Sequence, residues 1–259
     1  MNRRPAVAGA FYPANPTALR EMVDQYLEDA ETNAKVPKAI IAPHAGYIYS
    51  GPIAASAYAR LKKARQRINR VVLIGPSHRV AFRGLAVSRS EVFTTPLGDI
   101  DVDMDAVESI AGLPFVEYIE QAHTLEHSLE VHLPFLQETL ESFKLVPIVA
   151  GDASPEQVGQ VLDILWGGDE TLIVVSSDLS HYHDYLTARR LDEQTSNLIE
   201  QLKYEQLSSE GACGKVPVTG LLKLLREKAL RIKTVDLRNS GDTAGDKDRV
   251  VGYGAYVVD

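Results

Sequence analysis

Four short apolar runs limit what this 259-residue chain can fold into more than any other feature. Each run is too short for a helix and ends at a glycine, a proline or a polar cluster, which is typical of a buried strand. None of them alternates polar and apolar residues, so both faces of each strand are expected to be covered, as in a parallel or mixed sheet between helices. The runs are residues 39–42, 71–74, 145–149 and 172–175.

Amphipathic segments lie between these runs and predict helices on both faces of the sheet. They are residues 52–64, 129–140, 155–165, 187–202 and 219–228. Ser154, Pro155 and Gln157 predict a helix start, because they provide a capping hydroxyl, a proline at the first helical position and a capping-box glutamine. Residues 84–88 and 249–258 predict further strands with an antiparallel component. The sequence therefore predicts an α/β fold with a central mixed, largely parallel sheet flanked by helices.

The composition predicts one globular domain over residues 1–259 and excludes several classes of protein. Apolar residues make up 45% of the chain and charged residues 24%, so neither a disordered nor a fibrous protein is expected. The net charge of −8 would repel a phosphate backbone, which argues against a nucleic-acid partner. No apolar run reaches the ~20 residues needed to cross a bilayer, and no signal peptide is recognisable. The single cysteine, Cys213, cannot form an intramolecular disulfide, so a cytoplasmic location is expected.

Three of the four apolar runs lead to a histidine within a few residues of their carboxyl ends. The first run leads to His44, the second to His78, and the fourth to Asp178 and His181. Ligands of open α/β sheets bind beyond the carboxyl ends of the strands, so parallel neighbours would bring these side chains to one crevice. A single loop histidine often only bonds a backbone carbonyl. Three in equivalent positions favour a metal site, because imidazole nitrogen binds iron, copper, zinc and nickel.

Cys213 lies in a glycine-containing loop just before the helix predicted near residue 219. A lone free cysteine is most often a small buried hydrophobic residue. Its flanking glycines, however, permit close approach to a ligand. A helix N-terminus with Lys215 nearby would favour the thiolate that both metal binding and nucleophilic attack require. Two functional interpretations therefore stay open for Cys213, a metal ligand and a metal-free nucleophile activated by a histidine.

The segment 123–132 is dense in ionisable side chains. If it is helical throughout, His123 and His127 share one face and Glu126 and Glu130 share an adjacent one, a spacing that could hold a metal. The segment lacks the His-Glu-x-x-His order of a zinc protease, and a solvated helix surface explains several of these residues as well. The chain also has neither a phosphate-binding P-loop nor a Gly-x-Ser-x-Gly nucleophile elbow.

Six sequence blocks resemble the Memo family, whose prokaryotic members are often labelled AmmeMemoRadiSam system protein B. The blocks occur in order along nearly the whole chain, at residues 8–13, 42–47, 75–78, 126–134, 176–181 and 212–214. Memo proteins are similar in fold to class III extradiol dioxygenases, non-haem iron enzymes that open catechol rings. Those enzymes bind iron through two histidines and a glutamate. The resemblance therefore implies a dioxygenase-like α/β fold for this chain.

The resemblance also implies a set of metal ligands. His44 and His78 would be the two histidine ligands, and Cys213 would take the place of the dioxygenase glutamate. A thiolate favours softer or more oxidisable metal states, including copper, so the expected cofactor is Fe(II) or copper. Because this ligand differs from that of the dioxygenases, ring cleavage does not follow from the resemblance.

Further roles follow from the same resemblance. His181 would act as an acid–base residue with Asp178 beside it, and His127 and Tyr47 would line the substrate pocket. His123 and His183, by contrast, are expected to lie outside the cleft. The positions of these side chains in the structure test which of them lie in the cleft.

Two functions from different classes are compatible with these features. The first is a metal-dependent redox enzyme, a non-haem iron or copper oxidoreductase acting on a small substrate. The alternative is a non-catalytic binding module that recognises a peptide or small ligand in the same cleft, since eukaryotic Memo relatives are linked to phosphotyrosine-peptide recognition and one fold serves many functions. The sequence carries no signal for the substrate, the metal used in the cell or the oligomeric state.

Overall fold

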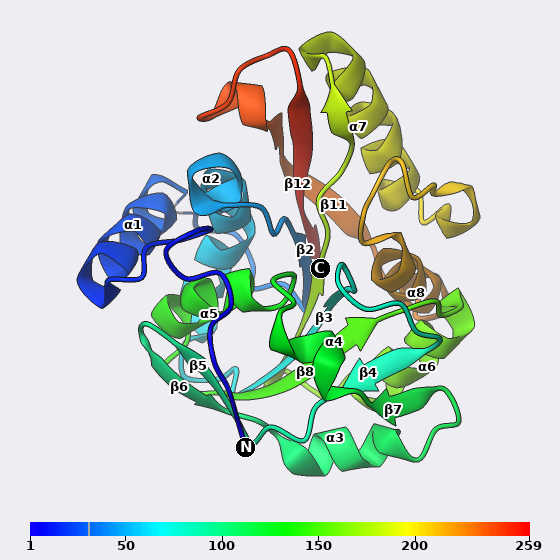
Figure 1. The fold of residues 1–259 in the computed structure, drawn as a ribbon. Coiled ribbons are helices and arrows are strands. Elements are labelled where there is room, and N and C mark those ends of the chain that lie inside the picture. Colours follow the sequence, from blue (N-terminus) through cyan, green and yellow to red (C-terminus); the bar gives the residue numbers. More distant parts are fainter. Residues whose placement is uncertain (31) are drawn as a thin grey trace.

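Within residues 1–30 and 32–259, which the computed structural model describes, nine strands form one mixed sheet (Figure 1). Its spatial order is β10-β12-β2-β9-β3-β8-β4-β7, and β11 pairs with β12. The strands are β2 (Ala39–Ala42), β3 (Arg70–Pro76), β4 (Leu85–Val87), β7 (Val116–Tyr118), β8 (Lys144–Ala150), β9 (Thr171–Ser176), β10 (His181–His183), β11 (Ile232–Asn239) and β12 (Val250–Val258). A small second sheet contains β1 (Asn2–Arg3), β5 (Val92–Thr95) and β6 (Gly98–Asp101).

The four predicted buried runs are the four central strands, and all of them are parallel. β2 pairs with β9, β9 with β3, and β3 with β8, while the flanking pairs of β12 with β2 and β4 with β8 are antiparallel. The register sets Ala42 opposite Ser176 and Ile74 opposite Val175, so these strands end at one edge of the sheet. The prediction of a mixed, largely parallel sheet is confirmed, and that edge is where the loops with His44, His78 and Asp178 begin.

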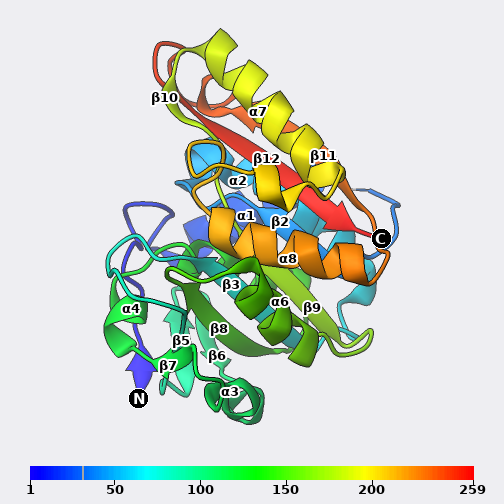
Figure 2. The ribbon, with the colours of Figure 1, turned by 90° about the vertical axis from the view of Figure 1, so that its right-hand side faces the viewer.

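Helices cover both faces of this sheet. In Figure 2, α6, α7 and α8 lie in front of the sheet, and α1 and α2 lie behind it. The helix α5 packs against α1 and α2 on that second face. The helices are α1 (Pro16–Asp29), α2 (Tyr47–Tyr58), α3 (Met104–Ala111), α4 (Glu120–Thr124), α5 (Leu133–Thr139), α6 (Pro155–Ile164), α7 (Tyr185–Glu200) and α8 (Lys215–Glu227). Four short 3-10 turns, η1 (Ala59–Ala64), η2 (Glu130–His132), η3 (Tyr204–Gln206) and η4 (Ser240–Asp242), complete the described elements.

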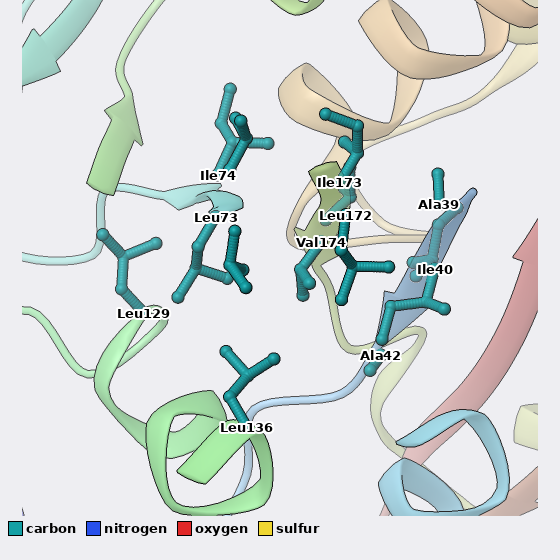
Figure 3. Close-up of a cluster of buried hydrophobic side chains, with 14 of the residues drawn as sticks. Ala39, Ile40, Ala42, Leu73, Ile74, Leu129, Leu136, Leu172, Ile173 and Val174 are labelled. Atoms are coloured by element: carbon teal, nitrogen blue, oxygen red, sulfur yellow. The ribbon is translucent and has the colours of Figure 1, made fainter. Parts of the chain in front are cut away.

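The core forms where apolar strands meet apolar helix faces. Figure 3 shows Ile40, Leu73 and Val174 from three neighbouring strands close to Leu129 and Leu136. All five side chains are almost fully buried. Burying a side chain of this size contributes about 1.5–3 kcal/mol, which makes the strand register energetically well determined.

Several predicted boundaries can be compared directly with the structure. Ser154 Oγ accepts a hydrogen bond from the backbone N–H of Gln157, and the Gln157 side chain accepts one from the N–H of Ser154, so the predicted capping box is confirmed. By contrast, α8 begins at Lys215, earlier than predicted. The segment 123–132 is not one helix, because α4 ends at Thr124 and the chain turns before η2. Among the helices of the described residues, none is long and apolar enough to cross a membrane.

A candidate metal centre at the carboxyl edge of the sheet

A pocket of ≈ 630 Å³ lies at the carboxyl ends of β2, β3 and β9. All seven histidines of the chain lie in its described part, and five of them line this pocket. The lining residues are His44, His78, His127, Asp178, His181, Tyr182, His183, Ser209, Glu210 and Cys213. The structure thus brings together side chains from segments that are far apart in the sequence.

His44, His78 and Cys213 form a compact group of possible metal ligands within this pocket. One ligand atom from each lies within 4.8 Å of the other two. Cys213 Sγ is 3.3 Å from His44 Nε2. In a tetrahedral site, two such ligand atoms are roughly 3.5 Å apart, given metal–nitrogen and metal–sulfur bonds of about 2.1 and 2.3 Å. The triad is therefore close to the spacing that a single ion requires.

A buried hydrogen-bond chain fixes the tautomer of His44. The Ser176 hydroxyl donates to the carbonyl oxygen of Ser128 at 2.6 Å, so its oxygen is left to accept hydrogen bonds. His44 Nδ1 lies 2.6 Å from this oxygen and His132 Nε2 lies 2.9 Å from it, so both nitrogens carry the donated hydrogen. The Tyr58 hydroxyl then donates to His132 Nδ1 at 2.8 Å. His44 consequently has its proton on Nδ1, and its Nε2 lone pair is available for a metal.

A buried carboxylate fixes His78 in the same way. Glu126 Oε1 accepts from His78 Nδ1 at 2.8 Å, which leaves His78 Nε2 as the free nitrogen. The carboxylate also accepts from the backbone N–H groups of His78, His127 and Ser128. Burial opposes its charge, but the hydrogen bonds from His78 and Ser128 outweigh burial and lower the pKa of Glu126 to about 2.

The geometry argues against Glu126 as a metal ligand. Its ligand atom also lies within 4.8 Å of those of His78 and His127, which defines a second possible metal group. However, both of its oxygens already accept hydrogen bonds from the groups named above. Glu126 is better placed to orient His78, as carboxylates commonly do for metal-binding histidines. The sequence predicts either metal ligands or a solvated helix surface for this segment, and the buried, orienting Glu126 is neither.

Cys213 is held against the end of β9. Its backbone N–H donates to the Asp178 carbonyl at 3.2 Å, and the Asp178 N–H donates to Cys213 Sγ at 3.3 Å. A Cβ atom on Gly214 would lie 2.4 Å from the Ser176 carbonyl oxygen, so glycine permits this close approach. Burial, aided by the Asp178 carboxylate, raises the pKa of the Cys213 thiol. The backbone N–H groups of Asp178 and Gly214 lower this pKa, as expected for a helix N-terminus, but burial outweighs them, so the thiolate is disfavoured in the protein without a metal.

Asp178 and His181 lie on the next stretch of the same loop. Asp178 Oδ1 accepts from the backbone N–H of His44 at 2.7 Å, and burial raises the pKa of its carboxyl group. His181 Nδ1 donates to the Leu179 carbonyl at 2.8 Å, so Nε2 is the nitrogen free to exchange a proton. The buried Asp192 accepts from the N–H of Ser180 and so fixes the backbone beside His181.

His127 forms one wall of the pocket. Its ring stacks on His78 with centroids 4.6 Å apart and lies 4.8 Å from the ring of Phe11. Burial, followed by the neighbouring His78, lowers the pKa of His127. An uncharged imidazole is therefore favoured at this position.

Two expectations about individual residues are wrong. Tyr47 does not line the pocket: it is 2% exposed, because the first turn of α2 directs it into the core, where its hydroxyl donates to the Val131 carbonyl. His183, which was expected outside the cleft, lines it. His123 lies outside this pocket, as expected, and its Nε2 donates to the Ala86 carbonyl. Tyr182, Ser209 and Glu210 are lining residues that carried no recognised signal in the sequence.

Comparisons with known proteins cover nearly the whole chain. The family model described as Memo-like protein matches residues 3–257. A MEMO1 family protein of Aquifex aeolicus is 39% identical in an alignment of 263 positions that covers 97% of each chain. One of Methanosarcina mazei is 38% identical in an alignment of 273 positions that covers 99% of each. The crystal structure of an uncharacterized protein from Escherichia coli K12 aligns with a TM-score of 0.53 at 16% identity, covering 85% of this chain and 98% of that one. This last similarity concerns the fold alone.

Proposed function

Because the chain belongs to the Memo family, we propose that it is a metal-dependent redox enzyme acting on a small organic substrate. His44, His78 and Cys213 would hold Fe(II) or copper. The dioxygenase-like fold predicted from the sequence agrees with this family and supports the proposal, because dioxygenases of that class use non-haem iron. The thiol in place of a glutamate separates the proposed chemistry from ring cleavage.

The main support for the proposal is that hydrogen bonds set the tautomer of each of the two imidazoles. Ser176 and Glu126 each fix a proton on Nδ1, which leaves both Nε2 atoms ready to bind an ion beside Cys213 Sγ. Two imidazole nitrogens and one sulfur suit iron or copper better than magnesium or calcium. When bound, the ion would supply redox chemistry and open coordination positions for O₂ or the substrate.

The other lining residues would bind the substrate and move protons. His181 has one nitrogen free and would exchange a proton with the substrate at Nε2. Asp178 Oδ1 would hold the backbone of His44 in place through the N–H of His44. His127 and Phe11 would exclude water from one side of the cleft. A reducing cytoplasm suits this arrangement, because it keeps the thiol of Cys213 available as a ligand.

The structure gives less support to a metal-free nucleophile. The thiolate is the reactive form of cysteine, and burial raises the pKa of Cys213 so that this form is disfavoured without a cation. The Asp178 carboxylate disfavours the thiolate further. A metal ion would reverse both effects.

Elemental analysis of protein purified without oxygen tests the proposal. The parent should contain stoichiometric iron or copper, and a redox titration should show the ion changing its oxidation state. His44→Ala should retain at most about a tenth of the metal that the parent holds. His183→Ala should retain the metal of the parent, because His183 lines the pocket but lies outside the triad. A folded parent that takes up neither metal would contradict the proposal and favour the non-catalytic binding module for a peptide or small ligand.

A further inference from the structure

The strand β10 contains a backbone irregularity at the wall of the cleft. Tyr182 has a φ angle of +63°, a left-handed conformation that residues other than glycine seldom adopt. On the partner strand, His181 lies opposite Val251 and His183 lies opposite the adjacent Val250. Two steps along β10 therefore match one step along β12, which is the pattern of a β-bulge.

This bulge explains how three consecutive residues reach one pocket. Side chains of a regular strand alternate between its two faces, so His181 and His183 would share a face that Tyr182 does not. In the structure, His181, Tyr182 and His183 all line the cleft. A left-handed non-glycine residue costs about 1 kcal/mol or more, and such conformations gather at functional sites. The left-handed conformation of Tyr182 thus accompanies its place in the lining of the cleft, between His181 and His183.

Packing does not account for the ring of Tyr182. The residue is 64% exposed, so it contributes little to the core. The guanidinium of Arg249 lies over its ring, 5.2 Å from the centroid, and restrains it on the rim. An exposed aromatic ring that is held in place and faces a pocket is a surface on which a flat group can stack.

The charges of the cleft indicate what kind of group it accepts. Asp178 and Glu210 line the pocket, and among the described lining residues there is neither a lysine nor an arginine. The guanidinium of Arg249 already lies over the Tyr182 ring. A phosphate or carboxylate would therefore find no fixed cationic side chain in the lining.

We propose that Tyr182 contacts the bound molecule directly and that this molecule presents a flat, uncharged group to it rather than an anionic one. This inference rests on the proposed function only in assigning the ligand to the same cleft. Tyr182 is thereby a residue that determines specificity, and the bulge of β10 is the feature that delivers it.

Thermal melting of two variants tests the strain. Tyr182→Gly and Tyr182→Ala both remove the ring, but only the alanine keeps a side chain in the left-handed conformation. Relief of this strain should give Tyr182→Gly a Tm about 2 °C or more above that of Tyr182→Ala. A glycine variant that melts at or below the alanine variant would show that the bulge is unstrained and would overturn this part of the proposal.

Binding of two probes tests the contact. Acetohydroxamate and benzohydroxamate bind a metal through the same group and differ by a flat ring. Calorimetry with Zn(II)-loaded protein should show benzohydroxamate binding roughly 2- to 12-fold tighter in the parent and in Tyr182→Phe, and this preference should disappear in Tyr182→Ala. A carboxylate added to the ring of the probe should weaken its binding to the parent.

Three results would overturn the proposal. The first is a parent that shows no preference for the ring, either because it binds both probes equally or because it binds neither. The second is an unchanged preference in Tyr182→Ala, and the third is tighter binding of the carboxylated probe by the parent. Zn(II) has no redox chemistry, so these measurements do not depend on the proposed enzyme activity. A protein that shows the ring preference with Zn(II) but no redox change with iron or copper would retain Tyr182 as a contact and lose the redox function.

Discussion

The carboxylate of Glu126 should control how tightly the triad binds a metal, and Glu126→Gln tests this. Its oxygens lie 2.8 Å from His78 Nδ1 and 2.6 Å from the backbone nitrogen of His78. They also accept from the N–H groups of His127 and Ser128, at 3.0 and 2.9 Å. Glutamine keeps the shape but replaces one oxygen by an NH₂ donor, so at least one of these N–H groups loses its acceptor. Loss of a partner that orients a metal-binding histidine typically weakens metal binding 10–100-fold, and we expect roughly that effect here.

The same substitution should change how stability depends on pH. The hydrogen bonds from His78 and Ser128 outweigh burial and lower the pKa of Glu126 from 4.5 to about 2. A pKa that is lower in the folded state stabilises the protein fully above pH 4.5, and this stabilisation is lost as the pH falls toward 2. The shift corresponds to roughly 3 kcal/mol at neutral pH. The free energy of unfolding of Glu126→Gln should therefore fall less steeply over this range than that of the parent.

Two measurements on the parent and on Glu126→Gln test the predicted changes in metal affinity and in stability. Competition with a chelator at neutral pH gives the metal affinity, and urea unfolding of metal-free protein at several pH values gives the stability. Glu130→Gln is the matched control, because Glu130 is also a buried carboxylate that accepts from Tyr12 and Arg3 but contacts none of the three proposed ligands. It should lower stability and leave metal affinity unchanged. Equal metal affinity in the parent and in Glu126→Gln would refute the orienting role.

Substitutions at three further positions separate the ligands from the residues that support them. Cys213→Ser should lower metal affinity sharply, because a hydroxyl is neutral, whereas Cys213→Glu should keep an Fe(II) site, because a carboxylate is an anionic ligand. Mass spectrometry of bound metal tests this, with a thermal melt as the folding control. Ser176→Ala should weaken metal binding roughly tenfold, because His44 loses the acceptor that fixes its tautomer; an unchanged chelator titration would contradict that assignment. Tyr47→Phe should cost about 1 kcal/mol in urea unfolding, through the lost bond to the Val131 carbonyl, without changing metal affinity; a change in affinity would return Tyr47 to the site.

The central sheet could be predicted because its strands are buried on both faces. Uniform apolar runs such as 39–42 and 71–74 have few alternatives in a chain of this size, and the structure confirms them as β2 and β3. The strand β11 was not predicted, because its middle residues are only half-buried and carry no clear apolar pattern. The strand β10 is three residues long and depends on its pairing with β12, which no local pattern specifies.

The site could be predicted only where the chain itself delivers a residue to the sheet edge. His44 and His78 follow their strands within four residues, so the parallel arrangement alone brings them together. Tyr47 also follows β2, but the start of α2 turns its side chain into the core, and that direction depends on the packing of the helix. Glu126 follows α4 rather than a central strand, and its place beside His78 depends on the turn after that helix.

The segment 126–132 orients both histidines of the triad through its hydrogen bonds. It supplies no ligand of the triad, yet Glu126 bonds His78, and the Ser128 carbonyl and His132 both bond the serine that fixes His44. One segment therefore sets the protonated nitrogen of both proposed histidine ligands. A buried ion pair between Arg3 and Glu130 ties this segment to the N-terminal strand, and Arg3 also donates to the Glu126 carbonyl. Because a buried charge left without its partner is strongly unfavourable, this ion pair contributes to the folding stability of the segment, while neither of its two residues lines the pocket.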